Sequence, residues 1–192
     1  WKSSLPADQA WRDSEEQACR RELRQLLEAL PDRFHAIVKQ TLESLPKIFS
    51  LPVVLIHGDF GFSNIFVDEP DCHLVGVVDW AEAAPGIFGT NLCDLWPLSG
   101  KLMLETGLIL FEDHNSLQET FWGVLSSEIG GLTDEQVQNI KAARTLGLLR
   151  VKGFTSRLKN MPEPVPIGRD ENGLYNMLYL DGLLLNQATR YQ

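Results

Sequence analysis

The chain has 192 residues, 44% hydrophobic and 22% charged, a balance typical of soluble globular proteins. Its formal net charge of −9 argues against non-specific binding to nucleic acid or to an anionic membrane surface, because both require a positive footprint. The sequence contains no apolar run of about 18 residues, so we expect no membrane-spanning helix.

The cysteines suggest the compartment. Cys19, Cys72 and Cys93 are odd in number and lack the spacing of metal ligands, which favours a reducing compartment, and we expect a cytoplasmic protein. The first residues resemble neither a signal peptide nor a basic transit sequence. The chain also lacks an initiator Met, which leaves open whether it is a trimmed piece of a longer protein.

The first 50 residues predict a helical hairpin. Residues 1–13 read as an irregular lead-in, and from Ser14 apolar residues recur on one helical face. Pro31 ends that helix and suits the first turn of a second one, which keeps its rhythm up to Pro52. The predicted hairpin spans residues 14–50.

The segment 53–80 carries the polar residues of interest. An apolar run at 53–56 leads into His57-Gly58-Asp59, and Asn64 follows five residues later. Two short apolar runs, 65–67 and 74–78, flank a polar turn and predict an antiparallel hairpin that ends on Asp79.

Such a hairpin brings its two ends together. Asn64 precedes the first strand and Asp79 follows the second, so we expect them to lie side by side. An amide oxygen and a carboxylate suit Mg²⁺, which takes few protein ligands and keeps water and phosphate around it. Asp59 would face the same space and suits a base that orients a substrate hydroxyl.

The remaining chain predicts mostly helices. Residues 81–91 read as a loop and 161–172, with three prolines, as a linker or lid. Capping-box signatures open two of the helices, at Ser116 and at Thr133. The expected helices are 92–104, 116–129, 133–158 and 173–188. Trp96, Trp122 and Phe154 fall at core-like spacing, which favours core packing over ligand contact.

The central segment resembles a known family. The order H-x-D-x-x-x-x-N, then a hairpin, then an Asp, resembles the catalytic loop and metal-binding segment of protein-kinase-like folds. More narrowly, HGDFGFSN and VVDWAEA are similar to the aminoglycoside phosphotransferase and choline kinase family. Farther on, Gly86 and Asp94 in APGIFGTNLCDL also match that family's pattern.

The resemblance implies a role for each matched residue. Asp59 would be the catalytic base, Asn64 and Asp79 the Mg²⁺ ligands, His57 a structural brace of the loop, and Asp94 its anchor from the next helix. The implied cofactors are Mg²⁺ and ATP or GTP. The implied reaction is phosphoryl transfer to the hydroxyl of a small molecule.

The resemblance also implies a fold. We expect an α+β, mostly helical chain that forms the C-terminal lobe of a protein-kinase-like fold, with a small β-hairpin carrying the catalytic loop. Residues 1–192 would be one domain: the helical hairpin 14–50, the loop and hairpin 53–80, and a helical subdomain 90–192.

The sequence shows no pattern for the smaller, β-rich lobe of such folds, which grips the nucleotide phosphates. No Gly-rich loop precedes residue 57, and none of the lysines in that part lies on a strand-like run. Three explanations stay open: a lobe whose N-terminal half is encoded or cleaved separately, a repurposed lobe with another enzymatic or ligand-binding role, and a structural partner domain.

The expected partners follow from charge and position. A cationic small-molecule acceptor would suit this acidic chain, and Glu82 is the candidate acceptor contact because it lies in the loop after Asp79. No nucleic-acid or membrane partner is expected. A second copy or another protein could cover the face that the missing lobe leaves open.

Overall fold

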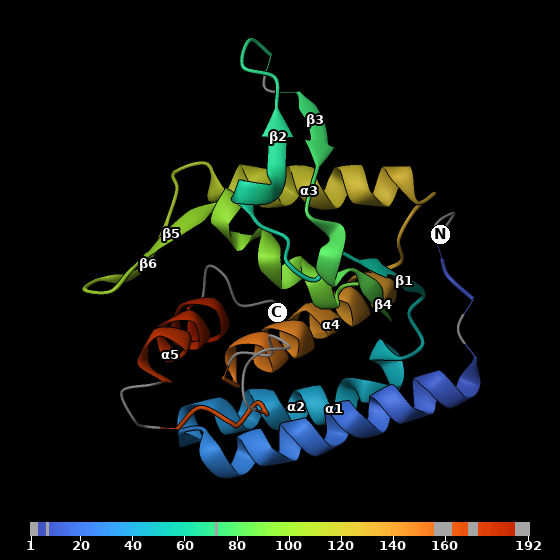
Figure 1. Ribbon diagram of the computed structural model, residues 1–192, viewed down its shortest axis with the longest axis vertical. Helices are drawn as coiled ribbons and strands as arrows, with labels where there is room; N and C mark the ends of the chain where they lie inside the picture. Colours follow the sequence, from blue (N-terminus) through green and yellow to red (C-terminus); the bar gives the residue numbers. More distant parts are fainter. Residues whose placement is uncertain (1–3, 7, 72, 156–162, 169–172, 187–192) are drawn as a thin grey trace.

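The computed structural model describes residues 4–6, 8–71, 73–155, 163–168 and 173–186. This part is mostly helical, with small antiparallel sheets, which agrees with the expected α+β class. Two long helices lie side by side at one end of the molecule, a third crosses beside them, and a hairpin projects at the opposite end (Figure 1). The α-helices are α1 (Gln9–Ala29), α2 (His35–Ile48), α3 (His114–Glu128), α4 (Asp134–Lys152) and α5 (Leu174–Leu180).

The helical hairpin begins earlier than expected. Helix α1 starts at Gln9 and not near Ser14, because the Asp8 side chain accepts a hydrogen bond of 2.7 Å from the Trp11 amide and caps the helix. Pro31 precedes a short 3₁₀ turn, η1 (Asp32–Phe34), which leads into α2. The part of the chain predicted as an irregular lead-in is therefore partly helical.

The core lies where α1, α2, α4 and α5 meet. Its fully buried side chains include Leu23, Leu26, Phe34, Leu45, Ile140, Leu149, Phe154 and Leu180. Arg150 on α4 adds a polar tie to α1, with bonds of 2.7 Å to Glu15 and 2.6 Å to Glu22. No helix in the described ranges is long and apolar enough to cross a membrane.

The strand before the loop at 57–64 pairs with a segment that was expected to be a loop. Strand β1 (Val53–Ile56) pairs antiparallel with β4 (Ala84–Ile87), where Val54 lies opposite Gly86. A Cβ at Gly86 would collide with the Ile56 side chain, so glycine allows this pairing. Pro85 is tolerated because a strand with a single neighbour leaves one edge free of hydrogen bonds.

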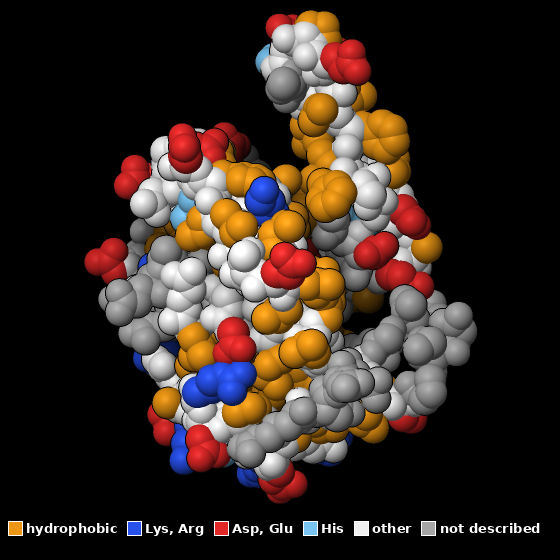
Figure 2. Space-filling model, turned by 90° about the vertical axis from the view of Figure 1, so that its left-hand side faces the viewer, with side chains coloured by type: hydrophobic (Ala, Val, Ile, Leu, Met, Phe, Trp, Pro, Cys, Tyr) orange, Lys and Arg blue, Asp and Glu red, His pale blue; other side chains and the backbone are white. Residues whose placement is uncertain are grey.

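The second sheet is the predicted hairpin. Strand β2 (Ile65–Val67) pairs antiparallel with β3 (Leu74–Val77), and Ile65 lies opposite Val77. The hairpin stands away from the helical body (Figure 1). Apolar side chains cover its length and acidic ones its tip (Figure 2).

The helix predicted at 92–104 is wrong. A 3₁₀ helix, η4 (Thr90–Leu98), ends one residue after Pro97, and a second hairpin follows. This hairpin pairs β5 (Gly100–Met103) with β6 (Gly107–Leu110). Gly107 has φ +76°, a left-handed conformation that favours glycine in the turn and that an α-helix cannot contain.

Of the two predicted capping boxes, one forms. Thr133 and Gln136 bond reciprocally at the start of α4, at 3.2 and 2.9 Å. Helix α3 instead starts at His114, and the Ser116 hydroxyl donates to the Asp113 carbonyl. Gly130 and Gly131 end α3 with positive φ, as expected.

The C-terminal part departs from its predicted bounds. Helix α4 ends at Lys152, and the next residues turn away so that Phe154 forms a β-bridge with Pro166. Helix α5 continues as a π-helical turn, η6 (Asp181–Leu185). Residues 156–158 and 187–188 of the expected helices, and half of the linker 161–172, lie outside the described residues.

Candidate active site

His57 lies at the end of β1 and is buried. Its ring packs against the Trp80 ring, with centroids 4.6 Å apart, and edge-on to the Phe60 ring, at 5.9 Å. Trp80 in turn donates its indole N–H to the Val77 carbonyl at 2.9 Å. The two aromatic rings therefore fix the imidazole at the base of the projecting hairpin.

A closed ring of hydrogen bonds links the loop to the hairpin. His57 Nε2 donates to the Val78 carbonyl (2.8 Å), and the Val78 amide donates to the Asn64 carbonyl (3.0 Å). The Asn64 side-chain Nδ2 donates to the Asp59 carbonyl (2.8 Å), and the Asp59 amide closes the ring on His57 Nδ1 (3.3 Å). This ring fixes the backbones of His57, Asp59, Asn64 and Val78 relative to one another.

A backbone hydrogen bond places Asn64 beside Val78, the residue that precedes Asp79. Because Nδ2 of Asn64 is held by the Asp59 carbonyl, the Asn64 Oδ1 oxygen remains for a ligand. In the described part of the chain, the carboxylates of Asp59 and Asp79 are exposed and make no hydrogen bond or ion pair.

Asp79 has a rare backbone conformation. Its φ of 63° and ψ of 59° place it in the left-handed region, and it is the single non-glycine residue with positive φ among the described residues. Aspartate tolerates this conformation better than most residues, although at a cost. Such outliers cluster at functional sites, where the surrounding structure holds them in place.

The glycine between His57 and Asp59 has a steric role. Gly58 has φ +84°, and a Cβ there would collide with the backbone carbonyl of Glu82. Glu82 belongs to the short 3₁₀ turn η3 (Trp80–Glu82). Its side chain borders a hollow of about 170 Å³ that Gly58 and Arg150 also line, so this candidate acceptor contact lies beside the loop.

Asp94 has a buried carboxyl that senses the charges of the loop. Its pKa is raised to about 6, chiefly because the carboxyl is buried, while Lys152 opposes the rise and the charge of Asp59 adds to it. Its recorded hydrogen bond comes from Cys93 Sγ, at 3.6 Å, and not from the loop. Asp94 is therefore close enough to the loop at 57–64 for the charge of Asp59 to change the pKa of its carboxyl.

The residues present fit a magnesium ion with few protein ligands. Among the described residues no group of three or more His, Cys, Asp or Glu side chains could hold a metal. Asn64 and Asp79 are the oxygen pair that remains at the site, and Mg²⁺ is commonly held by one or two carboxylates together with phosphate and water. Their chemistry suits a metal that arrives with a nucleotide.

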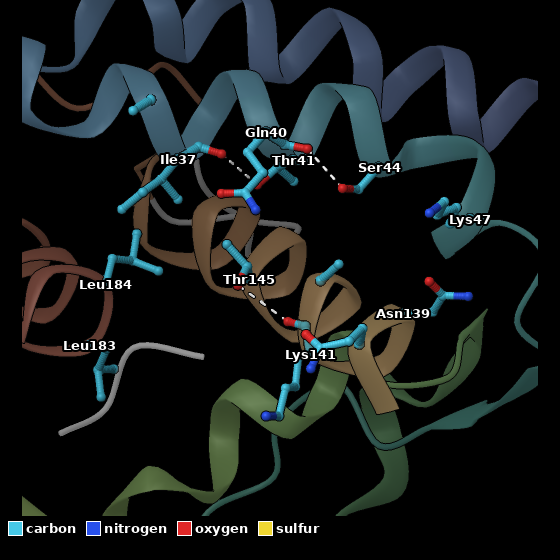
Figure 3. A pocket seen from close by; sticks show the side chains of 13 residues that line it. Ile37, Gln40, Thr41, Ser44, Lys47, Asn139, Lys141, Thr145, Leu183 and Leu184 are labelled. Atoms are coloured by element: carbon cyan, nitrogen blue, oxygen red, sulfur yellow. Dashed lines mark hydrogen bonds between the residues drawn. The ribbon is translucent and has the colours of Figure 1, made fainter. Parts of the chain in front are cut away.

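A different hollow lies between α2 and α4, with a volume of about 410 Å³. Lys47 on α2 and Asn139 on α4 face each other across it (Figure 3). The hydroxyls of Thr41 and Ser44 donate to carbonyls of their own helix. These donors are already used within a helix, and the hollow includes none of the predicted site residues.

Sequence reasoning missed the parts of the site that come from backbone. The Val78 carbonyl accepts the hydrogen bond from His57 and the Glu82 carbonyl lies against Gly58, yet neither contact has a side-chain signature. Trp80, directly after the candidate metal ligand, was the available signal for a ring packed on His57. Of the three expected core aromatics, Phe154 is buried, whereas Trp96 and Trp122 are partly buried.

The fold and the site define a mostly helical protein with a polar loop braced against a β-hairpin. The family model described as the phosphotransferase enzyme family (APH) matches residues 3–106, slightly more than half of the chain. The match includes α1, α2, the loop, the hairpin and Asp94. The chain belongs to this phosphotransferase family. Comparisons with curated proteins and with solved structures give no match.

Proposed function

We propose that this chain contributes the base and the metal ligands for phosphoryl transfer from ATP or GTP to the hydroxyl of a small molecule. The hydrogen-bonded ring through His57, Val78, Asn64 and Asp59 carries the proposal. It fixes the backbones of Asp59 and Asn64 beside Val78, the residue before Asp79. This supports a carboxylate next to an amide-carboxylate pair, the arrangement that the proposed reaction requires.

The side chains divide the work. The Asp59 carboxylate accepts a hydrogen bond from the acceptor hydroxyl, orients it, and receives its proton as the new oxygen–phosphorus bond forms. The bond between the γ-phosphorus and the bridging oxygen of the nucleotide breaks in the same step, and ADP or GDP leaves. Asn64 Oδ1 and the Asp79 carboxylate would hold Mg²⁺, which when bound neutralises charge on the nucleotide phosphates. His57 positions the loop and Asp94 acts on it through its charge.

The elements that grip the nucleotide come from elsewhere in this proposal. Lys39 and Lys47 both lie on helix α2 and not on a strand, and β1 is the only strand described before the loop. The hairpin that rises above the site exposes large apolar side chains, with Leu74 66% and Val75 70% exposed. We expect an N-terminal lobe, a second copy or another protein to cover it.

The same exposed hairpin favours one alternative. A lobe that no longer transfers phosphate would still offer this apolar surface to a partner. In that case Asp59, Asn64 and Asp79 would be remnants of an ancestral phosphotransferase site. Metal-dependent nucleotide binding separates the two functions.

The test is calorimetry of the 192-residue chain with ATP and with GTP, in the presence and absence of Mg²⁺. We expect Mg²⁺-dependent binding that Asp79→Ala abolishes and that Asp71→Ala, in the hairpin turn, leaves unchanged. Nucleotide binding that Asp79→Ala does not affect would contradict the proposal. Absence of binding up to millimolar nucleotide would favour the alternative, a lobe that no longer transfers phosphate.

A further inference from the structure

The hollow of about 410 Å³ between α2 and α4 has a lining that is part polar and part apolar. Leu183 and Leu184 of η6 close one end of it, beside Ile37 (Figure 3). Lys47 and Asn139 lie at the other end, and hydroxyl groups lie between the two ends. Small-molecule sites typically have volumes of about 300–1,000 Å³. The hollow therefore has the size of a site for a small molecule.

Three hydroxyl groups in the hollow have no hydrogen left to donate. Thr41 and Ser44 on α2 each donate to the carbonyl four residues earlier, at 2.8 Å. Thr145 on α4 does the same at 3.2 Å. A hydroxyl has one hydrogen and two lone pairs, so each of these groups can still accept a hydrogen bond. A ligand that bonds these oxygens must bring O–H or N–H groups.

Amide and ammonium groups supply donors along the same hollow. In the part of the chain that the structure describes, the side chains of Gln40, Asn139 and Lys47 make no hydrogen bond or ion pair. An amide both donates and accepts, whereas an ammonium only donates. A ligand that bonds the hydroxyls and these groups together must carry donors and acceptors side by side.

The charges around the hollow disfavour a cationic ligand. Its described lining includes Lys47 and Lys141 and no Asp or Glu, in a chain whose net charge is −9. A ligand ammonium would add a third positive charge with no carboxylate to pair with. A carboxylate is disfavoured as well, because the hydroxyls of Ser44 and Thr145 would turn lone pairs toward it. An uncharged body that carries several hydroxyl groups meets both conditions.

We infer that the hollow between α2 and α4 binds an uncharged sugar. The sugar hydroxyls donate to the oxygens of Ser44 and Thr145 and accept from the amides of Gln40 and Asn139. The C–H face of the ring packs on the apolar end of the hollow, which removes apolar surface from water. The inference does not depend on the proposed phosphoryl transfer, because the hollow includes none of the residues assigned to that reaction.

Three pairs of probes test the ligand class: glucose, galactose and mannose, each with its 2-amino analogue in the protonated form. Each probe is titrated at millimolar concentrations into the isotopically labelled full chain, and shifts of the amide signals report binding. We expect at least one of the three sugars to shift signals of residues 36–47 and 138–145. Its amino analogue should bind about fivefold more weakly, because the added charge is repelled by the lysines.

No shift in these two segments with any of the three sugars would overturn the inference. An amino analogue that binds as tightly as its parent sugar would overturn it as well.

Two pairs of variants locate the binding. Thr145→Val keeps the shape of the side chain but removes the acceptor, and should weaken binding of the sugar about 3- to 10-fold, whereas Thr145→Ser should restore it. Gln40→Trp, at an exposed position, fills the hollow and should weaken binding at least about tenfold. Gln25→Trp is the same change at an exposed position of α1 outside the hollow and should change nothing. An unchanged affinity in Thr145→Val or Gln40→Trp, or a loss in Gln25→Trp, would refute the site.

Discussion

His57 joins the two ends of the site through its two ring nitrogens: Nε2 donates to the Val78 carbonyl at 2.8 Å, and Nδ1 accepts from the Asp59 amide at 3.3 Å. A carbonyl oxygen can only accept and an amide N–H can only donate, so these contacts select the neutral imidazole with its proton on Nε2. The residue acts as a brace between the loop and the hairpin.

Removing the His57 brace should destabilise both the loop and the hairpin. We expect His57→Phe, which keeps a ring but loses both hydrogen bonds, to lower the free energy of unfolding by about 1–3 kcal/mol, measured by urea denaturation. His73, an exposed residue directly before β3, provides the control. We expect His73→Phe to lower the free energy of unfolding by less than about 0.5 kcal/mol. Equal stability of the two variants would rule out the bracing role.

Gly58 is required by both its conformation and its neighbour. Gly58→Ala would force a Cβ against the Glu82 carbonyl at φ +84°, and we expect a loss of about 1–3 kcal/mol. Gly76→Ala is the matched control, because nothing lies within 4 Å of a Cβ at that strand position. Thermal unfolding of both variants checks this. A Gly58→Ala protein as stable as Gly76→Ala would mean that the loop does not need this close approach.

Asp94 should make stability depend on pH. The pKa of this carboxyl is about 6 in the fold, against an ordinary value of 3.8, so the fold favours the protonated form. The contribution is complete below about pH 4 and is lost as the pH rises through about 6. Asp94→Asn should therefore be more stable than the parent by about 1–3 kcal/mol at pH 7, with no such difference near pH 4. Unfolding curves of both proteins at several pH values test this, and a pH-independent difference would contradict it.

The ion pairs of the chain should differ in their effect on stability. Arg150 lies between Glu15 and Glu22, where the three side chains are largely covered, so Arg150→Met removes the cation that bonds both acids. We expect a loss of about 2–4 kcal/mol. Arg33, paired with Asp181 at 2.6 Å on the surface, is the control, and Arg33→Met should cost less than about 1 kcal/mol. Similar urea midpoints for the two variants would contradict the assignment.

Local signals predicted the β2–β3 hairpin and the start of helix α4. The hairpin 65–77 follows from β-branched runs around a turn, and the Thr133 capping box follows from four consecutive residues. The resemblance to the phosphotransferase family rests mainly on the stretch from His57 to Trp80, together with Gly86 and Asp94. These features depend on neighbours in the sequence and can be read from it.

Long-range pairing could not be predicted in this way. Strand β4 exists because β1, some 30 residues earlier, offers it an edge, as the pairing of Val53 with Ile87 illustrates. The β5–β6 hairpin takes the place of the last residues of the helix expected at 92–104. Gly107 allows its tight turn. The backbone contacts of Val78 and Glu82 with the loop likewise depend on the folded arrangement.

The most direct test of the account is the position of a bound divalent ion. Mn²⁺, added with ATP to the isotopically labelled chain, broadens the amide signals of nearby residues. We predict broadening around Asp59, Asn64 and Asp79 that disappears in Asp79→Ala and persists in Asp71→Ala. Broadening centred on the acidic tip of the hairpin, or unchanged by Asp79→Ala, would contradict the assignment of Asn64 and Asp79 as the metal ligands.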